Sequence, residues 1–267
     1  MRTMDAVEDE GTLEKRRLIV KNVVIAVGIL TVLVLLYKVT ALRGDRVHYE
    51  WRFDVVIKNL PFLLQGIMMS VAVALASMAV GLITGMVAAL ARLSKNPWLS
   101  ASAYCYVEFF RTTPMLVQLV WVYYCLPIIF NLSFGPFASS IIALGLNAGA
   151  FFSEIFRAGI TSIAKGQTEA ALALGMTTRQ AFRRIILPQA ITRMLPPIGS
   201  NWISLIKDSS LVSAIALADL MYRGRVLSSI TYRPLEILTV TAILYFLLTY
   251  PQSIWVNWLH RKYATAD

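Results

Sequence analysis

Six long apolar runs, separated by shorter polar segments, set the pattern of the chain. Each contains about 20 mainly apolar residues, enough for a helix to cross the ~30 Å hydrocarbon core of a bilayer. The pattern predicts an all-α membrane protein with six crossings and both termini on one side. The predicted spans are 18–37, 62–90, 113–130, 138–160, a broken one around 191–220, and 236–258.

Two of these spans carry further signals. The first follows the basic residues Lys15, Arg16 and Arg17 and has no small-residue cleavage pattern after it, which favours a retained signal-anchor helix over a cleaved signal peptide. The second, 62–90, is rich in Ala, Gly, Ser and Met, and its small residues predict close contact with another helix.

The segment 97–111 is too short and too aromatic for an independent span. Pro97 marks its start, and Trp98, Tyr104 and Tyr106 suit the headgroup layer. We expect a helix along the cytoplasmic interface. The alternative is a two-turn extension of the third span.

Composition agrees with a membrane protein. Hydrophobic residues make up 57% of the 267 residues, and charged residues only 15%, which is more apolar than a soluble domain of this length can bury. The net charge is +10, and the basic residues are distributed over the segments between apolar runs. This distribution is typical of loops near anionic lipid and does not indicate a nucleic-acid partner. Cys105 and Cys125 lie in or near apolar segments and are expected to be free thiols.

The distribution of Lys and Arg predicts the orientation. Fourteen fall on the N-terminal side of the predicted spans and eight on the other. Since cytoplasmic loops are enriched in these residues, both termini and the segment 161–190 are predicted to be cytoplasmic.

The segment 169–188, EAALALGMTTRQAFRRIILP, is a polar, helix-forming stretch between apolar spans. Gly175 is expected to interrupt the first helix or to pack closely, and a second helical piece over 178–186 is expected to end at Pro188. The segment is therefore predicted to form a short helix–bend–helix on the cytoplasmic side. It could be a docking element for another protein or an ordinary amphipathic loop that packs on the bundle.

The spacing in this segment resembles the EAA loop of permease subunits in bacterial ATP-binding-cassette importers. In that family the loop forms a coupling helix that sits in a groove of the cytoplasmic ATPase. The resemblance implies that ATPase coupling resides in Glu169, Ala170, Ala171, Gly175, Arg179, Ile185, Leu187 and Pro188.

Flanking stretches resemble the polar amino-acid branch of the same family, over about 55–260. They are FRTTPMLVQ at 110–118, the run 153–176, LPQAITRMLPPI at 187–198 and LIKDSSLVSAIALADL at 205–220. The resemblance implies a type I importer permease with a five-helix core, preceded by an added N-terminal helix. The expected parts are a cytoplasmic tail 1–17, a transmembrane helix and periplasmic linker 18–54, the core 55–260 and a tail 261–267.

Charged residues inside the predicted spans are further candidates, because a buried ionisable group usually faces a partner or a cavity. Glu154 and Arg157 share a helical face and could neutralise one another, or Glu154 could meet a substrate amine. The polar run Lys207, Asp208, Ser209 and Ser210 interrupts the fifth span. It predicts a substrate path or gate, with a salt bridge between Lys207 and Asp208 as the alternative.

The sequence predicts no chemistry of its own. His48 and His260 are far apart, and neither a phosphate-binding loop nor a hydrolase nucleophile motif occurs. No cofactor is expected in this chain. The resemblance implies that a partner ATPase binds ATP and Mg²⁺ and performs the hydrolysis.

The expected partners are a cytoplasmic ATPase dimer, a second permease subunit (identical or paralogous), a periplasmic solute-binding protein and membrane lipid, without nucleic acid. The setting is the bacterial inner membrane. The resemblance favours glutamate or aspartate as substrate, with glutamine, histidine and arginine as rivals. An ion-gradient-driven carrier, which would predict an inverted repeat, and a scaffold without transport remain as alternatives.

Overall fold

A computed structural model describes residues 49–132 and 134–264, with isolated positions between 27 and 38. The chain divides into two compact units, Met1–Trp51 and Arg52–Asp267. The predicted first span, 18–37, lies outside the described residues apart from those isolated positions, and so does the predicted tail 1–17. The description below concerns the second unit.

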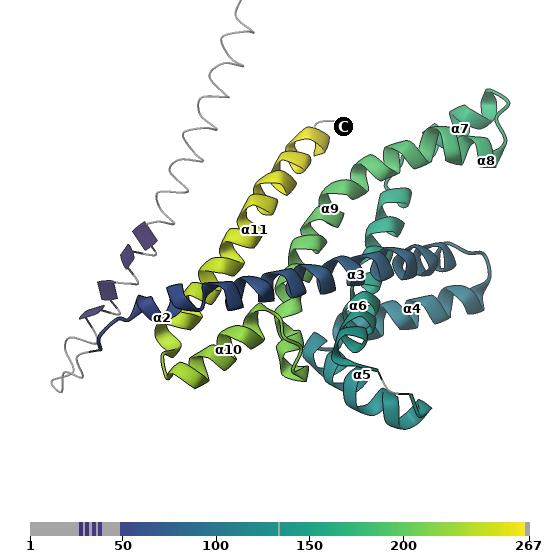
Figure 1. Ribbon diagram of the computed structural model, residues 1–267. Helices are drawn as coiled ribbons and strands as arrows, with labels where there is room; N and C mark the ends of the chain where they lie inside the picture. The colour runs from purple at the N-terminus through teal and green to yellow at the C-terminus, as the bar shows by residue number, and fades with distance from the viewer. Residues whose placement is uncertain are drawn as a thin grey trace, which may run out of the picture. The chain divides into compact units, whose positions relative to one another are not determined.

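The second unit is helical, and its described residues contain no strand, which confirms the all-α prediction. Figure 1 shows the order of its elements. They are α2 (Phe53–Lys58), α3 (Leu60–Arg92), α4 (Pro97–Thr112), α5 (Met115–Phe130), α6 (Pro136–Thr161), α7 (Lys165–Ala173), α8 (Thr178–Ala181), the π-helical turn η1 (Phe182–Ile186), α9 (Leu187–Asp208), the 3-10 helix η2 (Ser209–Ile215), α10 (Leu220–Thr231) and α11 (Pro234–Ala264).

Fewer helices than predicted have the length and composition of a complete span. Within the described residues, α3, α6 and α11 do, and α4 with α5 makes a fourth if the pair counts as one bent span. The axes of α4 and α5 differ by 107°, so the alternative of α4 as a straight extension of the third span is wrong. The predicted broken fifth span, around 191–220, corresponds to α9 followed by η2; α9 carries polar side chains such as Arg193 and Asn201 and is not among the helices with the composition of a complete span.

The bend between α4 and α5 is held by two side-chain amides, those of the buried Gln118 and the half-buried Asn147. Thr113, which precedes Pro114, is extended, as the proline ring requires. The Gln118 side-chain amide donates to the carbonyls of Phe110 and Thr113 at 2.9 and 3.0 Å. Asn147 of α6 donates to the same Phe110 carbonyl and to Gln118, at 2.9 and 3.0 Å. The bend is thereby fixed to α6.

The helices α3 and α6 pack closely through glycines spaced four residues apart. A Cβ added to Gly81 would lie 3.0 Å from the Ala148 Cβ, and one added to Gly85 would lie 2.8 Å from the Gly149 carbonyl oxygen. A Cβ on Gly149 would meet the Thr84 hydroxyl at 2.1 Å. The close contact predicted from the small residues of 62–90 is confirmed.

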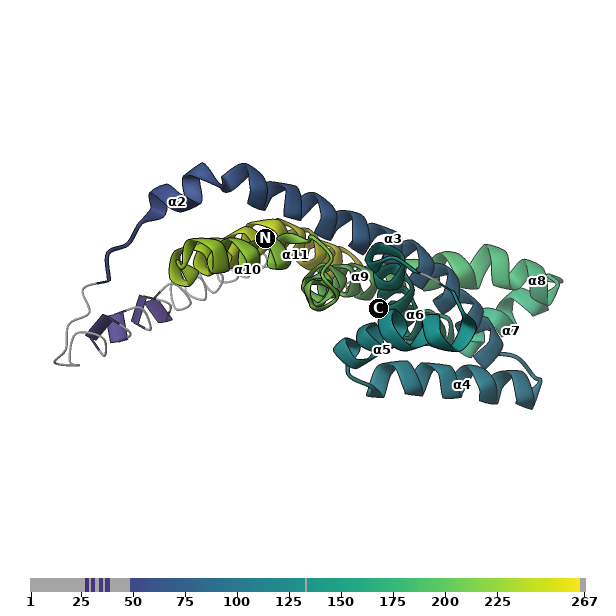
Figure 2. The same ribbon diagram turned by 60° about the horizontal axis from the view of Figure 1, so that its bottom comes forward.

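Two apolar cores hold the unit together. The larger one joins α3, α5, α6, α9 and η2 and includes Leu119, Phe152 and Ile206. The smaller one joins α2, the start of α3, α10 and the start of α11. The helix α10 was not expected from the sequence; Figure 2 shows it beside α11.

Candidate functional site

The segment 165–188 forms a helical hairpin at one end of the bundle, which we call the coupling hairpin after the family loop that its sequence resembles. Its first helix, α7, ends at Ala173, and Gly175 adopts a left-handed φ of 79°. The N–H of Gly175 donates to the Leu172 carbonyl at 2.9 Å, and that of Met176 to the Ala171 carbonyl at 3.1 Å. These two bonds satisfy the last carbonyls of α7 in the Schellman pattern. Nothing lies within 4 Å of a Cβ built on Gly175, so this glycine interrupts the helix and does not serve close packing.

The second arm starts with a capping box. The Thr177 hydroxyl accepts from the Gln180 N–H at 3.3 Å, and the Gln180 side chain accepts from the Thr177 N–H at 2.8 Å. This arrangement satisfies two of the free N–H groups at the start of α8. The sequence signal, Thr followed three residues later by Gln, was present, but the interpretation of the segment did not use it.

Pro188 does not end the second arm, contrary to the prediction. The chain continues from α8 through the π-helical turn η1 into α9, where Pro188 is the second residue. The wider turn of a π-helix changes the backbone hydrogen-bond register, and the first turn of a helix tolerates proline because its N–H groups lack intrahelical partners there. One helical segment therefore runs from Thr178 to Asp208.

The hairpin buries one alanine of each arm and exposes its tip. Ala171 and Ala181 are 3% and 0% exposed, Ile185 and Leu187 are half-buried, and Glu169, Ala170, Arg179 and Pro188 are exposed. Leu174 is 83% exposed at the tip, beside Gly175. Both views show the hairpin extending away from the other helices (Figures 1 and 2). A charged surface with an exposed leucine at its tip can dock to another protein.

The polar break lies at the opposite end of α9. The α-helix ends at Asp208, and the 3-10 helix begins at Ser209, so the predicted interruption of the helix by this polar run is observed. Lys207 is exposed, Asp208 and Ser210 are half-buried, and Ser209 is buried and donates to the Ile206 carbonyl at 2.7 Å.

Glu154 is the centre of an ion cluster. Arg157 approaches it at 2.9 Å, which confirms the neutralising pair considered from the sequence. Arg92, the last residue of α3, also pairs with Glu154, and Arg111 of α4 lies 3.5 Å from it. These two contacts join residues far apart in the sequence, and no local pattern could reveal them.

Glu154 and the polar break are therefore separate sites. The helices α6 and α9 are joined by the coupling hairpin and pack against each other, so the end of α6 and the start of α9 lie on the same side. Glu154 is near that end of α6, whereas Lys207 is near the far end of α9. Glu154 thus lies toward the hairpin end of the bundle, and Lys207, Ser209 and Ser210 lie toward the other end; that these residues line a substrate path or gate stays a prediction.

A buried carboxylate outside the predicted set caps α10. Asp219 is fully buried, accepts from the N–H groups of Met221 and Tyr222 at 3.2 and 2.8 Å, and accepts from the Tyr245 hydroxyl at 3.1 Å. Its role here is to fix α10 against α11. Within the described part of the chain, no group of three His, Cys, Asp or Glu residues could hold a metal ion.

Residues 81–265 match the family of inner-membrane components of binding-protein-dependent transport systems. The chain is 35% identical over 216 residues to the glutamine transport system permease protein GlnP of Escherichia coli strain K12, covering 80% of this chain and 98% of that protein. It is 36% identical over 216 residues to the arginine transport system permease protein ArtQ of Bacillus subtilis strain 168, with the same coverage.

Solved structures give the same result. The chain is similar to a protein in the crystal structure of an amino acid ABC transporter with histidines, at a TM-score of 0.75 and 34% identity, covering 80% of this chain and 100% of that one. A chain of the MetNI methionine ABC transporter matches at a TM-score of 0.56 and 22% identity, over 77% of this chain and 96% of that one. The match to the methionine transporter chain, at 22% identity, supports the fold alone.

Proposed function

Because the chain belongs to the family of inner-membrane components of binding-protein-dependent transport systems, we propose that it translocates polar amino acids as the membrane subunit of an ATP-driven importer. ATP is bound and hydrolysed by a separate cytoplasmic ATPase. Energy from that ATPase enters this chain through the coupling hairpin.

The observation that carries the proposal is the construction of that hairpin. Its two arms are fixed by the Schellman bonds at Gly175 and by the capping box at Thr177, while Glu169, Arg179 and Leu174 face outward. A defined shape with an exposed mixed surface suits docking into a groove of another protein. An amphipathic loop that packs on the bundle would instead bury Leu174.

The hairpin has a direct mechanical connection to the polar break. Its second arm continues into α9 and reaches Asp208 without leaving helical structure. When closure of the ATPase moves the hairpins of two permease subunits, α9 transmits the movement to its far end. The residues at that end, Lys207, Asp208, Ser209 and Ser210, act as the gate. Irregular backbone with polar groups is suited to this place because it must face protein or a water-filled path.

The proposed partners are an ATPase dimer, a second permease subunit and a periplasmic solute-binding protein that delivers the substrate. We also propose that both termini are cytoplasmic, as the distribution of Lys and Arg predicts. The relatives are named for glutamine and arginine, and the preference for glutamate or aspartate suggested by the sequence gains no support from those names. We therefore assign the substrate class as polar amino acids.

Copurification tests the proposal. Membranes are solubilised in detergent, the tagged chain is captured, and bound chains are identified by mass spectrometry for the wild type, a variant with residues 169–176 scrambled, and Glu169→Ala. We expect an ATPase subunit and a permease subunit with the wild type, loss of the ATPase alone from the scrambled variant, and a partial loss from Glu169→Ala.

Absence of an ATPase from the wild type, under conditions that keep the permease pair together, would contradict the proposal. The ion-driven carrier would then be tested by measuring uptake after the ion gradient is dissipated.

A further inference from the structure

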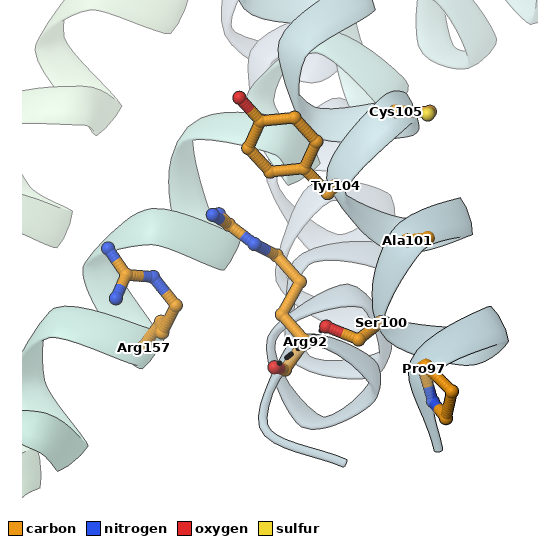
Figure 3. Close-up of a pocket in the computed structure, with 7 residues that line it drawn as sticks. All are labelled: Arg92, Pro97, Ser100, Ala101, Tyr104, Cys105 and Arg157. Carbon is orange, nitrogen blue, oxygen red and sulfur yellow. Dashed lines mark hydrogen bonds between the residues drawn. The ribbon is translucent and has the colours of Figure 1, made fainter. Parts of the chain in front are cut away.

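A pocket of about 530 Å³ lies where the end of α3, the first half of α4 and the last turns of α6 meet. Figure 3 shows Arg92 and Arg157 beside the face of α4 that carries Ser100 and Tyr104. The pocket is open to the surroundings, because Tyr104 is 52% exposed and Cys105 is also exposed. None of these five residues belongs to the coupling hairpin or the polar break.

Both arginines keep N–H donors that the described residues do not use. Arg92 bonds Glu154 through its Nη1, and Arg157 bonds Glu154 through its Nε and Nη2. Within the described residues, no acceptor takes the Nη1 of Arg157 or the Nε and Nη2 of Arg92. A guanidinium has five N–H donors in a planar fork, so donors remain for a ligand in the pocket.

The charge of this region is positive. Glu154 faces three guanidiniums, those of Arg92, Arg111 and Arg157. Glu108 lies 4.0 Å from Arg111 and offsets only one of them. A surplus of guanidinium charge with unused donors selects an oxyanion, and phosphate matches the fork through paired hydrogen bonds.

The surroundings of the pocket indicate where the phosphate comes from. At the start of α4, Trp98 is 83% exposed and Leu99 is 47% exposed, and Tyr104 adds an aromatic ring at the pocket itself. Exposed tryptophan and tyrosine beside arginine are typical of the headgroup layer, where basic pockets between helices bind acidic lipids.

We propose that this pocket is a binding site for a phosphate group, held by Arg92 and Arg157 and carried by the headgroup of an anionic phospholipid. The Ser100 hydroxyl, which donates to the Arg92 carbonyl at 3.3 Å, and the Tyr104 ring form part of its wall. The bound lipid would hold the ends of α3, α4 and α6 together at the membrane surface. This site is independent of the transport function proposed above.

The native Cys105 thiol is the reporter. In a Cys125→Ala background, the full-length chain with its copurifying subunits is placed in nanodiscs of phosphatidylcholine, with or without phosphatidylglycerol, and the rate of N-ethylmaleimide labelling at Cys105 is measured by mass spectrometry. A further arm uses detergent-solubilised protein with inorganic phosphate. We expect phosphatidylglycerol to slow the labelling of Cys105.

Variants separate the pocket from the general surface charge. Arg157→Gln should raise about tenfold the phosphatidylglycerol concentration that gives half of the maximal protection of Cys105. A factor of this size is the effect of losing a hydrogen bond to a charged group. Lys95→Gln, which removes the same charge from the neighbouring loop, should leave it unchanged. Arg157→Lys keeps the charge beside Glu154 but loses the fork, so it should give an intermediate result even if the glutamine variant does not fold.

Protection by phosphatidylglycerol that Arg157→Gln reduces and Lys95→Gln does not would support a lipid headgroup site. Equal protection by millimolar inorganic phosphate would keep the phosphate site but overturn the lipid as its source. Equal loss in Lys95→Gln and Arg157→Gln, or no protection by either ligand, would overturn the proposal.

Discussion

The Asn147 side-chain amide donates to the Gln118 side-chain oxygen over 3.0 Å and so joins α6 to the bend between α4 and α5. Gln118 is 5% exposed, and its own amide holds the carbonyls that the bend leaves without helical partners. The direction of α5 therefore depends on a network that spans three helices.

Asn147→Leu should destabilise the protein by about 1–3 kcal/mol, because it leaves the side-chain oxygen of the buried Gln118 without its donor and removes one of the two bonds to the Phe110 carbonyl. The measurement is thermal unfolding in detergent. Ser102→Ala is the control, since Ser102 is exposed and bonds within its own helix. An unchanged melting temperature for Asn147→Leu would show that the network does not hold the bend.

Gly149→Ala should cost about 1–3 kcal/mol, because the new Cβ overpacks the contact between α3 and α6. The nearest atom is the Thr84 hydroxyl oxygen, at 2.1 Å, so Thr84→Ala combined with Gly149→Ala should restore part of the loss. Gly166→Ala is a matched control with nothing within 4 Å. If Gly149→Ala and Gly166→Ala unfold at the same temperature, the close packing is not important for stability.

Much of this architecture was predictable because it depends on local spacing. The small residues of 62–90 allow another helix to approach closely, which is why that span indicated a close helix contact. Glu154 and Arg157, three residues apart, had to share a face. The bend at Gly175 followed from a residue that readily adopts positive φ.

The rest depended on contacts between distant segments or on backbone geometry. Arg92 and Glu154 are 62 positions apart, and no periodicity links them, so the three-arginine cluster was missed. Pro188 was predicted to end the helix because proline has no backbone N–H to donate, whereas the chain continues through the π-helical turn η1 into α9. The distance between Glu154 and Lys207 could not be predicted, because it depends on how α6 and α9 pack and on where each residue lies along its helix.

Gly175→Val should reduce the copurification of the ATPase about tenfold, because a left-handed conformation costs a residue with a Cβ roughly 1–2 kcal/mol and disturbs both arms of the hairpin. Gly166→Val tests the same side chain in α7, where φ is not positive. Equal ATPase recovery from the two variants would show that the left-handed turn does not matter for docking.

Lys207→Ala should lower substrate uptake by about tenfold, the size of one lost charge-assisted contact, with the ATPase and permease partners still bound. Uptake of radiolabelled glutamine and arginine in cells, together with copurification, measures both effects. Lys58→Ala, which alters an exposed lysine of α2, is the control. Normal uptake with Lys207→Ala would remove Lys207 from the proposed gate.

The most direct test of the account is photo-crosslinking from the tip of the coupling hairpin. A photoreactive amino acid replaces Leu174, which is 83% exposed, or Ile128, which is 81% exposed and lies near the end of α5. Irradiated membranes are then searched for crosslinked chains by mass spectrometry. We predict that the probe at position 174 captures an ATPase subunit and that the probe at position 128 does not. Capture of no ATPase at position 174, or equal capture at both positions, would contradict coupling through this hairpin.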